Sequence, residues 1–304
     1  MTAAWIAGVQ RSDGAIPWYD DGPLDAWNHV EAAMGLDVAG RHAEAEAAYL
    51  WLAESQNPDG SWYSYPELAK DANFTAYAAV GVLHHALIAD MSFLERLWPT
   101  IDAAMQFVLS LRRPDGAIRW RTGSSECLLA GNSSIHLALR CATDIASRLG
   151  RSRPEWVAAA DGLRAVIVNR PEVFTPKPHS MDWYYPVLCS VVGENGLASK
   201  WETFVVPDLG VRCVHDQPWV TGGETAELAL TLAVRGDKDR ARQLLADIAF
   251  LRHTDGSYWT GYQFANQVIW PAERTTWTAG AMLLAAAAID DEPATHTVFS
   301  QAAV

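Results

Sequence analysis

The chain has 304 residues, half of them apolar, which is enough for one large continuous core. Its formal net charge of -13 argues against nucleic acid and against an anionic membrane surface, because both attract clustered Lys and Arg. No apolar run is long enough to span a bilayer, and residues 1–10 lack the pattern of a signal peptide. The four cysteines lack the spacing of zinc sites or disulfide frameworks, so we expect reduced thiols, no metal and a cytoplasmic protein.

A helix-breaking signature ending in Asp-Gly recurs along the chain. Its copies are Gln10–Gly14, Gln56–Gly60, Arg112–Gly116 and His253–Gly256, with a weaker form at Pro207–Gly210. An aromatic follows most copies, namely Trp18, Trp62, Trp120 and Trp259. A repeat of roughly 45 to 55 residues is typical of helical arrays, solenoids and propellers. Each copy follows a helical pattern, and its Pro, Asp and Gly supply the turn that ends it.

Two kinds of helix are predicted between these breakers. Apolar helices, buried on every side, are expected at about 25–39, 72–89, 126–147, 181–193, 223–235 and 274–289. Amphipathic helices are expected at 2–10, 41–56, 94–112, 154–169, 196–204 and 237–252.

The two kinds of helix do not pair up at the chain ends. The first amphipathic helix has no buried partner before it, and the last buried helix has no amphipathic partner after it. The simplest solution is a closed ring in which 2–10 packs beside 274–289. We therefore predict an all-α (α/α)6 toroid of inner and outer helices, a single catalytic domain over 1–304. An open right-handed solenoid is the alternative.

In such a ring the residues that open the buried helices face one cavity. Nearly every buried helix opens with an acid: Asp25, Asp71, Glu126, Asp182, Glu224 and Glu273. Helix capping accounts for such acids singly, because carboxylates satisfy free N–H groups at the positive helix end. Capping does not explain why tryptophans fall in the same loops: Trp27, Trp183, Trp219, Trp259, Trp270 and Trp277.

Acids beside aromatic plates are what sugar chemistry needs. Glycoside hydrolysis requires one acid that protonates the leaving oxygen and one carboxylate that activates water or attacks the sugar. Asp25 and Glu224 come from opposite sides of the predicted ring, so they are the predicted catalytic pair, with Glu273 in reserve. The predicted substrate-binding residues are Trp18, Trp27, Asn28, His29, Trp62, Asp71, Asn73, Asp182, Trp183, Tyr184, Trp219, Tyr258, Trp259, Trp270 and Trp277. A core position is the alternative for His29. No cofactor is predicted.

The repeats, as in Pro58–Trp62, resemble the prenyltransferase and squalene-cyclase superfamily, which folds as α/α toroids. The resemblance covers the repeat framework and speaks to fold. The cyclase signature D-x-D-D is missing, and Asp20–Asp25 has one residue too many for the D-D-x-x-D that holds magnesium diphosphate. Isoprenoid transfer or cyclisation therefore remains an alternative function, and a non-catalytic glycan-binding toroid is another.

A second resemblance runs over nearly the whole chain. It is carried by Gly14–Trp18, Asp25–Glu31, Met181–Pro186, Trp219–Glu224, Gly256–Gly261 and Trp270–Trp277. These segments are similar to an actinobacterial family of methylmannose polysaccharide hydrolases, often labelled prenyltransferase. The resemblance implies a glycosidase that acts internally on α-1,4-linked, 3-O-methylated mannose chains. It also implies function at Asp25, position 28 and Glu224.

The chain departs from that family at one position. The family pattern is Asp-x-x-Asp, whereas this chain has Asn28, and an amide cannot act as an acid or a base. If position 28 is catalytic, the chain is an inactivated enzyme or a relative that uses other carboxylates. If Asp25 and Glu224 are the pair, Asn28 binds a hydroxyl. The leading hypothesis has Glu224 as general acid and Asp25 orienting or activating water.

Overall fold

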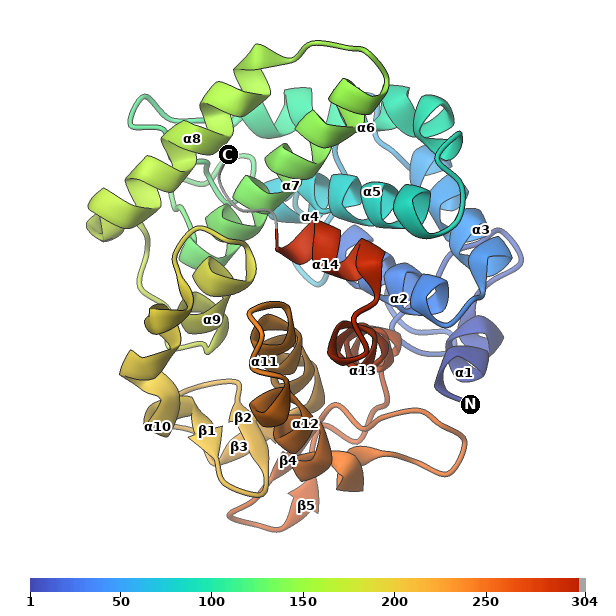
Figure 1. Cartoon of the computed structure of the whole chain (residues 1–304), viewed down its shortest axis with the longest axis vertical. Helices are drawn as coiled ribbons and strands as arrows, with labels where there is room; N and C mark the ends of the chain where they lie inside the picture. The colour runs from blue at the N-terminus through green and yellow to red at the C-terminus, as the bar shows by residue number, and fades with distance from the viewer. Residues whose placement is uncertain (301–304) are drawn as a thin grey trace.

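Two concentric rings of helices make up the structure, a computed structural model that describes residues 1–300 (Figure 1). The inner ring contains α2 (Ala26–Val38), α4 (Ala72–Ala76), α5 (Ala78–Ile88), α7 (Leu129–Arg148), α9 (Met181–Leu188), α11 (Gly222–Val234) and α13 (Thr276–Ile289). The outer ring contains α1 (Thr2–Val9), α3 (His42–Glu54), α6 (Phe93–Ser110), α8 (Pro154–Asn169), α10 (Trp201–Phe204) and α12 (Lys238–Asp247). Short 3-10 turns lie at Pro171–Val173, Glu194–Lys200 and Ala249–Leu251. The predicted toroid is confirmed, and residues 301–304 of the predicted domain lie outside the described part.

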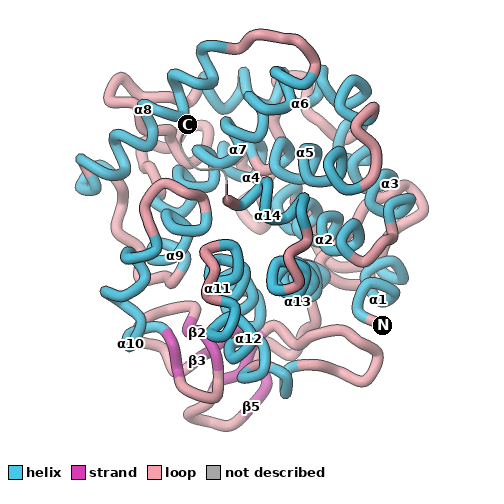
Figure 2. The backbone as a smooth tube through the Cα atoms, in the orientation of Figure 1, coloured by secondary structure: helices cyan, strands magenta, loops and turns pink. Residues whose placement is uncertain are grey.

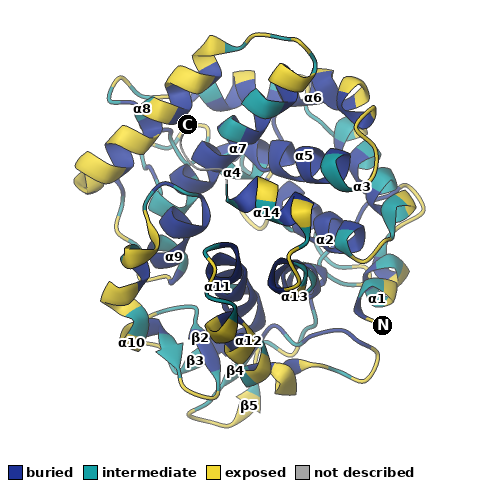
Figure 3. Ribbon diagram, viewed as in Figure 1, coloured by how far each residue is buried: buried dark blue, intermediate teal, exposed yellow. Residues whose placement is uncertain are grey.

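The hydrophobic pattern explains which helices are inside. Inner helices such as α5 and α13 are apolar nearly all round and are buried, whereas outer helices keep an exposed face (Figure 3). No helix among residues 1–300 has both the length and the apolar character needed to cross a membrane.

The repeated breakers end outer helices by close backbone contact. Gly14 and Gly60 have φ of +96° and +87°, a region that favours glycine. A Cβ on Gly14 would lie 2.2 Å from the carbonyl oxygen of Ala47, and one on Gly60 would lie 2.2 Å from that of Ala103. The Asp-Gly repeat therefore marks where each turn packs against the next outer helix.

The first and last inner helices close the ring. α13 packs between α2 and α11, and α1 packs against α13, as predicted for residues 2–10. Two glycines allow this approach: a Cβ on Gly35 would lie 2.6 Å from the Cα of Gly280, and one on Gly280 would lie 2.6 Å from the carbonyl oxygen of Glu31. No larger residue fits at this crossing without moving backbone.

A helix that the sequence analysis did not predict, α14 (Pro293–Phe299), lies across the centre of the ring in Figure 1. It crosses the C-terminal ends of the inner helices. The Thr295 hydroxyl is 3.1 Å from His84 Nε2, and the Ser190 hydroxyl donates to the Phe299 carbonyl at 3.4 Å. α14 therefore covers one end of the ring.

Within residues 1–300 a five-stranded antiparallel sheet lies beside α11 and α12 (Figure 2). Its order is β1-β2-β3-β4-β5, with bounds Val205–Val206, Gly210–Arg212, Trp219–Thr221, Gly261–Gln263 and Val268–Ile269. Thr221 pairs with Gly261, and β3 runs directly into α11. Strands of two or three residues are too short to show the alternation by which a strand is predicted.

Two acids are buried inside the inner ring. The Tyr77 hydroxyl donates to Glu31 at 2.7 Å, and the hydroxyls of Tyr184 and Tyr185 donate to Glu227. Burial raises the pKa of Glu31 to about 7. Burial, with the nearby charge of Glu31 adding to it, raises the pKa of Glu227 to about 8. The two carboxyls thus face a shared, poorly solvated interior with hydroxyl partners.

The close contact between Gly35 and Gly280 predicts that adding one methyl group there destabilises the fold strongly. Gly280→Ala should destabilise the fold by about 1–3 kcal/mol, because the new methyl group meets the backbone of α2. Gly8→Ala in α1 is the matched control, since nothing lies within 4 Å of its added Cβ, and alanine favours helix there. Denaturant unfolding of both variants measures the difference. Equal stability of Gly280→Ala and the wild type would contradict the crossing.

The buried acids predict a stability that falls with rising pH. Both groups hold their protons more tightly in the fold than at their ordinary pKa of 4.5, so their contribution is complete below that pH. This stabilising contribution is lost as the pH rises through about 7 for Glu31 and about 8 for Glu227. Glu227→Gln keeps a hydrogen-bonding group without the ionisation and should flatten this fall. Thermal unfolding across pH tests this, and parallel curves for the two proteins would refute it.

Candidate active site

Asp25 and Glu224 lie at the same end of the ring, on either side of the N-terminus of α13. On one side, the Thr276 backbone N–H donates to the Trp18 carbonyl at 2.7 Å, and the Trp18 indole N–H donates to Asp25 at 2.7 Å. On the other side, the ring of Trp277 lies against Gly223, next to Glu224. The helix starts are therefore gathered at the end opposite α14, as the toroid requires. We refer to this end as the mouth.

Asp25 is the N-cap of α2 and is only 3% exposed. Its Oδ1 accepts the Asn28 backbone N–H at 2.9 Å, and its Oδ2 accepts the Asn28 amide at 2.7 Å as well as the Trp18 indole. Burial raises the pKa of Asp25, while these donors favour the charged form and work against that shift. The carboxylate is thus held rigidly, with Asn28 as its main partner.

Glu224 lies in the first turn of α11 and is partly buried. The Thr221 hydroxyl and the Cys213 thiol both donate to its carboxylate. The two glycines before it are required by packing: a Cβ on Gly222 would lie 2.8 Å from Thr278, and one on Gly223 would lie 2.2 Å from the Trp277 ring. The Gly-Gly pair therefore allows α11 to pack closely on α13.

A cavity of about 260 Å³ opens at the starts of α4, α7 and α9. Asp71 lines it as the N-cap of α4, and burial, with the charge of nearby Asp25 adding to it, raises its pKa to about 7. Asp182 accepts the Ala130 backbone N–H at 3.0 Å, and burial raises its pKa as well. Asn73, also predicted, lines the same cavity. Three predicted residues are thus brought together near Asp25.

Other predicted residues form the layer beneath the mouth. Trp27 is 7% exposed and stacks on Tyr77 with ring centroids 4.0 Å apart. Tyr184 is fully buried and donates to Glu227. These buried aromatic rings pack beneath the helix starts that form the mouth.

Four residues predicted to bind substrate are part of the framework instead. Trp62 donates its indole N–H to the Leu52 carbonyl at 3.1 Å, and Trp183 donates to the Leu197 carbonyl at 3.1 Å. Tyr258 is 8% exposed. Both ring nitrogens of His29 bind backbone groups, at 3.0 and 2.9 Å, so the core alternative holds for this residue. An aromatic after a helix breaker packs inward as readily as it faces a ligand.

Glu273 does not join the mouth acids. It lines a separate hollow of about 640 Å³, together with Trp259 and residues of α1. Trp219 and Trp270 form an edge-to-face pair on the sheet, with centroids 5.0 Å apart, and Trp270 is 52% exposed. The loop acids and tryptophans are therefore divided between two hollows and the sheet, because the loop before α13 turns outward toward α1.

Several residues at the site were not predicted. Trp120, Lys177 and His179 line the cavity beside Asp71, and the Trp120 side chain hydrogen-bonds the Asp71 carboxylate. Trp120 carried a signal, because it is the aromatic that follows the third breaker. Lys177 and His179 lie in an irregular loop without a pattern.

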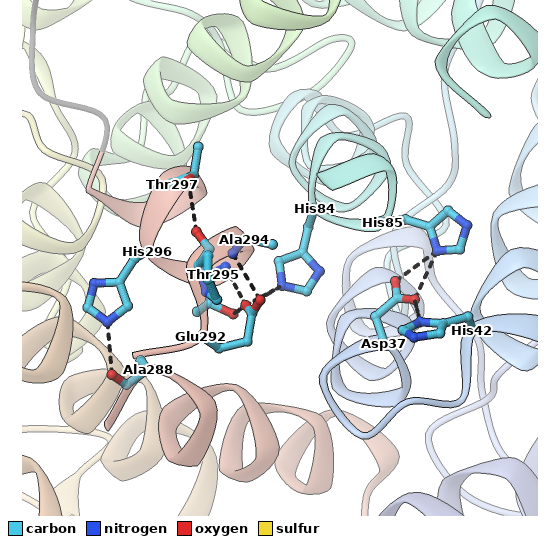
Figure 4. A network of polar contacts seen from close by, with 11 residues as sticks. Asp37, His42, His84, His85, Ala288, Glu292, Ala294, Thr295, His296 and Thr297 are labelled. Carbon is cyan, nitrogen blue, oxygen red and sulfur yellow. Dashed lines mark hydrogen bonds and ion pairs between the residues drawn. The ribbon is translucent and has the colours of Figure 1, made fainter. Parts of the chain in front are cut away.

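The opposite end of the ring holds a separate histidine network (Figure 4). Asp37 is bonded by His85 at 2.9 Å and by His42 at 3.2 Å, near the C-terminus of α2. His84 lies 3.9 Å from Glu292, the N-cap of α14. These contacts join α14 and α3 to the inner ring. Across residues 1–300, no group of three or more His, Cys, Asp or Glu side chains is arranged to hold a metal ion.

Comparisons with solved structures agree with this fold. A glycosidase variant in complex with glucose has a TM-score of 0.77 at 17% identity over 95% of each chain. A GH63 mannosylglycerate hydrolase from Thermus thermophilus has a TM-score of 0.69 at 12% identity, covering 93% of this chain and 98% of the other. A D-mannose isomerase reaches 0.64 at 13% identity over 95% of each chain. At such identities the likeness shows the fold alone.

Sequence comparison is more specific. No model of a protein family matches the chain. A protein of Mycolicibacterium hassiacum, named MMP endo-(1,4)-3-O-methyl-alpha-D-mannosidase, is 45% identical over an alignment that covers 95% of this chain and 85% of the relative. The alignment thus covers nearly the whole length of this chain. The chain therefore belongs to the family of the MMP endo-(1,4)-3-O-methyl-alpha-D-mannosidases.

Proposed function

We propose that this protein is a glycoside hydrolase that cleaves internal α-(1,4) bonds in chains of 3-O-methylmannose. The observation that carries the proposal is the 45% identity, over 95% of the chain, to a relative named for that activity. The mouth supports it, because carboxylates from α2 and α11, the two inner helices that flank α13, lie at one end of the ring beside aromatic side chains.

Glu224 is the proposed general acid. It is partly buried at the mouth, so a leaving oxygen can reach it, and the Thr221 hydroxyl orients its carboxyl group. The buried Glu227 lies one turn below it on α11.

Asp25 is the proposed carboxylate that orients or activates water. Three donors, from Asn28 and Trp18, hold both of its oxygens in place. Such fixed geometry is what lets a carboxylate direct water at one face of a sugar. Asp71 and Asp182, with Asn73, line the adjoining cavity and are proposed to bind sugar hydroxyls.

Asn28 is proposed to position Asp25 in place of the second Asp of the family pattern. Its amide donates to Asp25 at 2.7 Å. Two carboxylates at that separation would have to share a proton, since like charges so close cannot both ionise. The amide of Asn28 makes a hydrogen bond to Asp25 but does not ionise, so the two groups do not compete for a proton. The hydrogen bonds from Asn28 favour the charged form of Asp25, against the effect of burial, and position 28 itself transfers no proton.

We also propose a cytoplasmic location for this activity. All four cysteines are unpaired, three of them buried. Unpaired thiols are typical of proteins kept in reducing compartments.

The assignment of Glu224 is tested by Glu224→Gln. Loss of a general acid should lower kcat on α-(1,4)-linked methylmannose oligosaccharides by roughly 10² to 10⁴-fold with KM little changed. Glu202→Gln, at an exposed position on α10, is the control and should retain full activity. New reducing ends are counted over time. Wild-type kcat in Glu224→Gln would exclude this residue as the acid.

Asn28→Asp tests the role of position 28. The wild-type chain should release reducing ends, and Asn28→Asp should move the pH–rate profile, because the new carboxyl shares a proton with Asp25. If only Asn28→Asp is active, the wild-type chain is an inactivated relative. If neither protein cleaves any α-glycan while sugars still quench tryptophan fluorescence, a binding function replaces the hydrolase.

A further inference from the structure

The larger hollow lies outside the proposed active site. It has a volume of about 640 Å³ and is lined by neither Asp25 nor Glu224. Its walls come from α1, from the loop at Tyr19 and Asp20, and from the segments around Trp259 and Glu273. A hollow of this size is within the range of small-ligand sites. We refer to it as the α1 groove.

The side chains of the α1 groove have the chemistry of a sugar-binding surface. Trp5, Tyr19 and Trp259 are each partly buried, so part of each ring remains accessible. Aromatic faces accept the apolar C–H face of a pyranose, and an O-methyl group adds apolar area to it. Glu273 supplies acceptors and Arg274 supplies donors for hydroxyl groups.

The groove is held in shape before any ligand arrives. The Arg274 guanidinium lies over the Trp259 ring, 5.2 Å from its centroid. Arg274 is itself fixed by Asp255 at 2.6 Å and by the Ser257 hydroxyl at 3.0 Å. Trp5, on the opposite wall, packs against the hydrophobic core. A rigid aromatic surface loses little conformational entropy on binding.

One short loop separates the groove from the mouth. Trp18 donates its indole N–H to Asp25, whereas the next two residues, Tyr19 and Asp20, line the groove. The other side is joined as well: Glu273 lines the groove, and Thr276, three residues later, binds the Trp18 carbonyl. The loop from Trp18 to Asp20 therefore borders the mouth on one side and the α1 groove on the other.

We infer that the α1 groove binds the same glycan chain a few sugars away from the cleaved bond. This inference rests on the proposed function and deepens it, since an enzyme that cuts within a polymer gains from holding it beyond the reacting sugar. The ligand class is a neutral α-linked pyranose chain. The carboxylates of Asp20 and Glu273 on the rim disfavour anionic polymers.

The inference is tested with Trp5→Ala and two substrates: full-length methylmannose polysaccharide and the shortest oligosaccharide that the wild type cleaves. We expect kcat/KM on the polysaccharide to fall roughly tenfold, as about 1.4 kcal/mol of lost contact gives. Activity on the short oligosaccharide should not change. Trp201→Ala is the matched control. Trp201 is also partly buried, and the Arg240 guanidinium lies 4.8 Å from its ring centroid, but Trp201 belongs to outer helix α10 and does not line the groove. Equal losses on both substrates, or none, would overturn the inference.

A binding measurement separates this inference from the proposed function. In a Glu224→Gln background, calorimetric titration with the polysaccharide should show roughly tenfold weaker binding after Tyr19→Ala, and no change after Trp201→Ala. Tyr19 lies in a loop, so its loss tests the groove without removing the core packing of Trp5. Absence of hydrolysis by the wild type would remove the proposed function alone. Unchanged affinity in Tyr19→Ala and Trp5→Ala would rule out glycan binding by the α1 groove.

Discussion

The close crossing of α2 and α13 is the constraint on which the rest of the structure depends. At Gly35 and Gly280 the two helices approach so closely that neither position has room for a Cβ atom. This crossing joins the beginning of the chain to its end and closes the inner ring. Because the ring is closed, the starts of α2, α11 and α13 lie together although they are far apart in the sequence. Asp25 and Glu224 lie on either side of the start of α13 for that reason.

Burial then gives these acids their chemistry. Asp25, Asp71 and Asp182 serve as helix-capping groups, and burial raises the pKa of each of them. Each carboxyl group is held in place by backbone N–H donors, while its low solvation raises its proton affinity. The deeper pair, Glu31 and Glu227, extends the same effect into the interior, where only tyrosine hydroxyls are available as partners.

The toroid itself does not decide the reaction. Structures of similar fold include glycosidases and a D-mannose isomerase, all below 20% identity to this chain. Function depends on which side chains stand at the mouth. Here the alignment to a relative named as an endo-mannosidase, at 45% identity, covers 95% of the chain. Asn28 is compatible with that proposal, because its amide donates a hydrogen bond to Asp25 and its proposed role requires no proton transfer.

The sequence by itself determined the ring of inner and outer helices, because apolar and amphipathic segments differ in pattern and Asp-Gly turns recur between them. It also placed Asp25 and Glu224 at helix starts. Only the tertiary structure decided which neighbouring aromatics are buried in the framework and which line a hollow. Trp62 and Trp183 turn inward to satisfy their indole N–H groups on backbone carbonyls, whereas Trp259 lines a groove. It likewise separated Glu273 from Asp25, and it placed α14 across the far end. Side-chain direction in loops depends on contacts between segments that are distant in the sequence, and such contacts cannot be predicted from a local pattern.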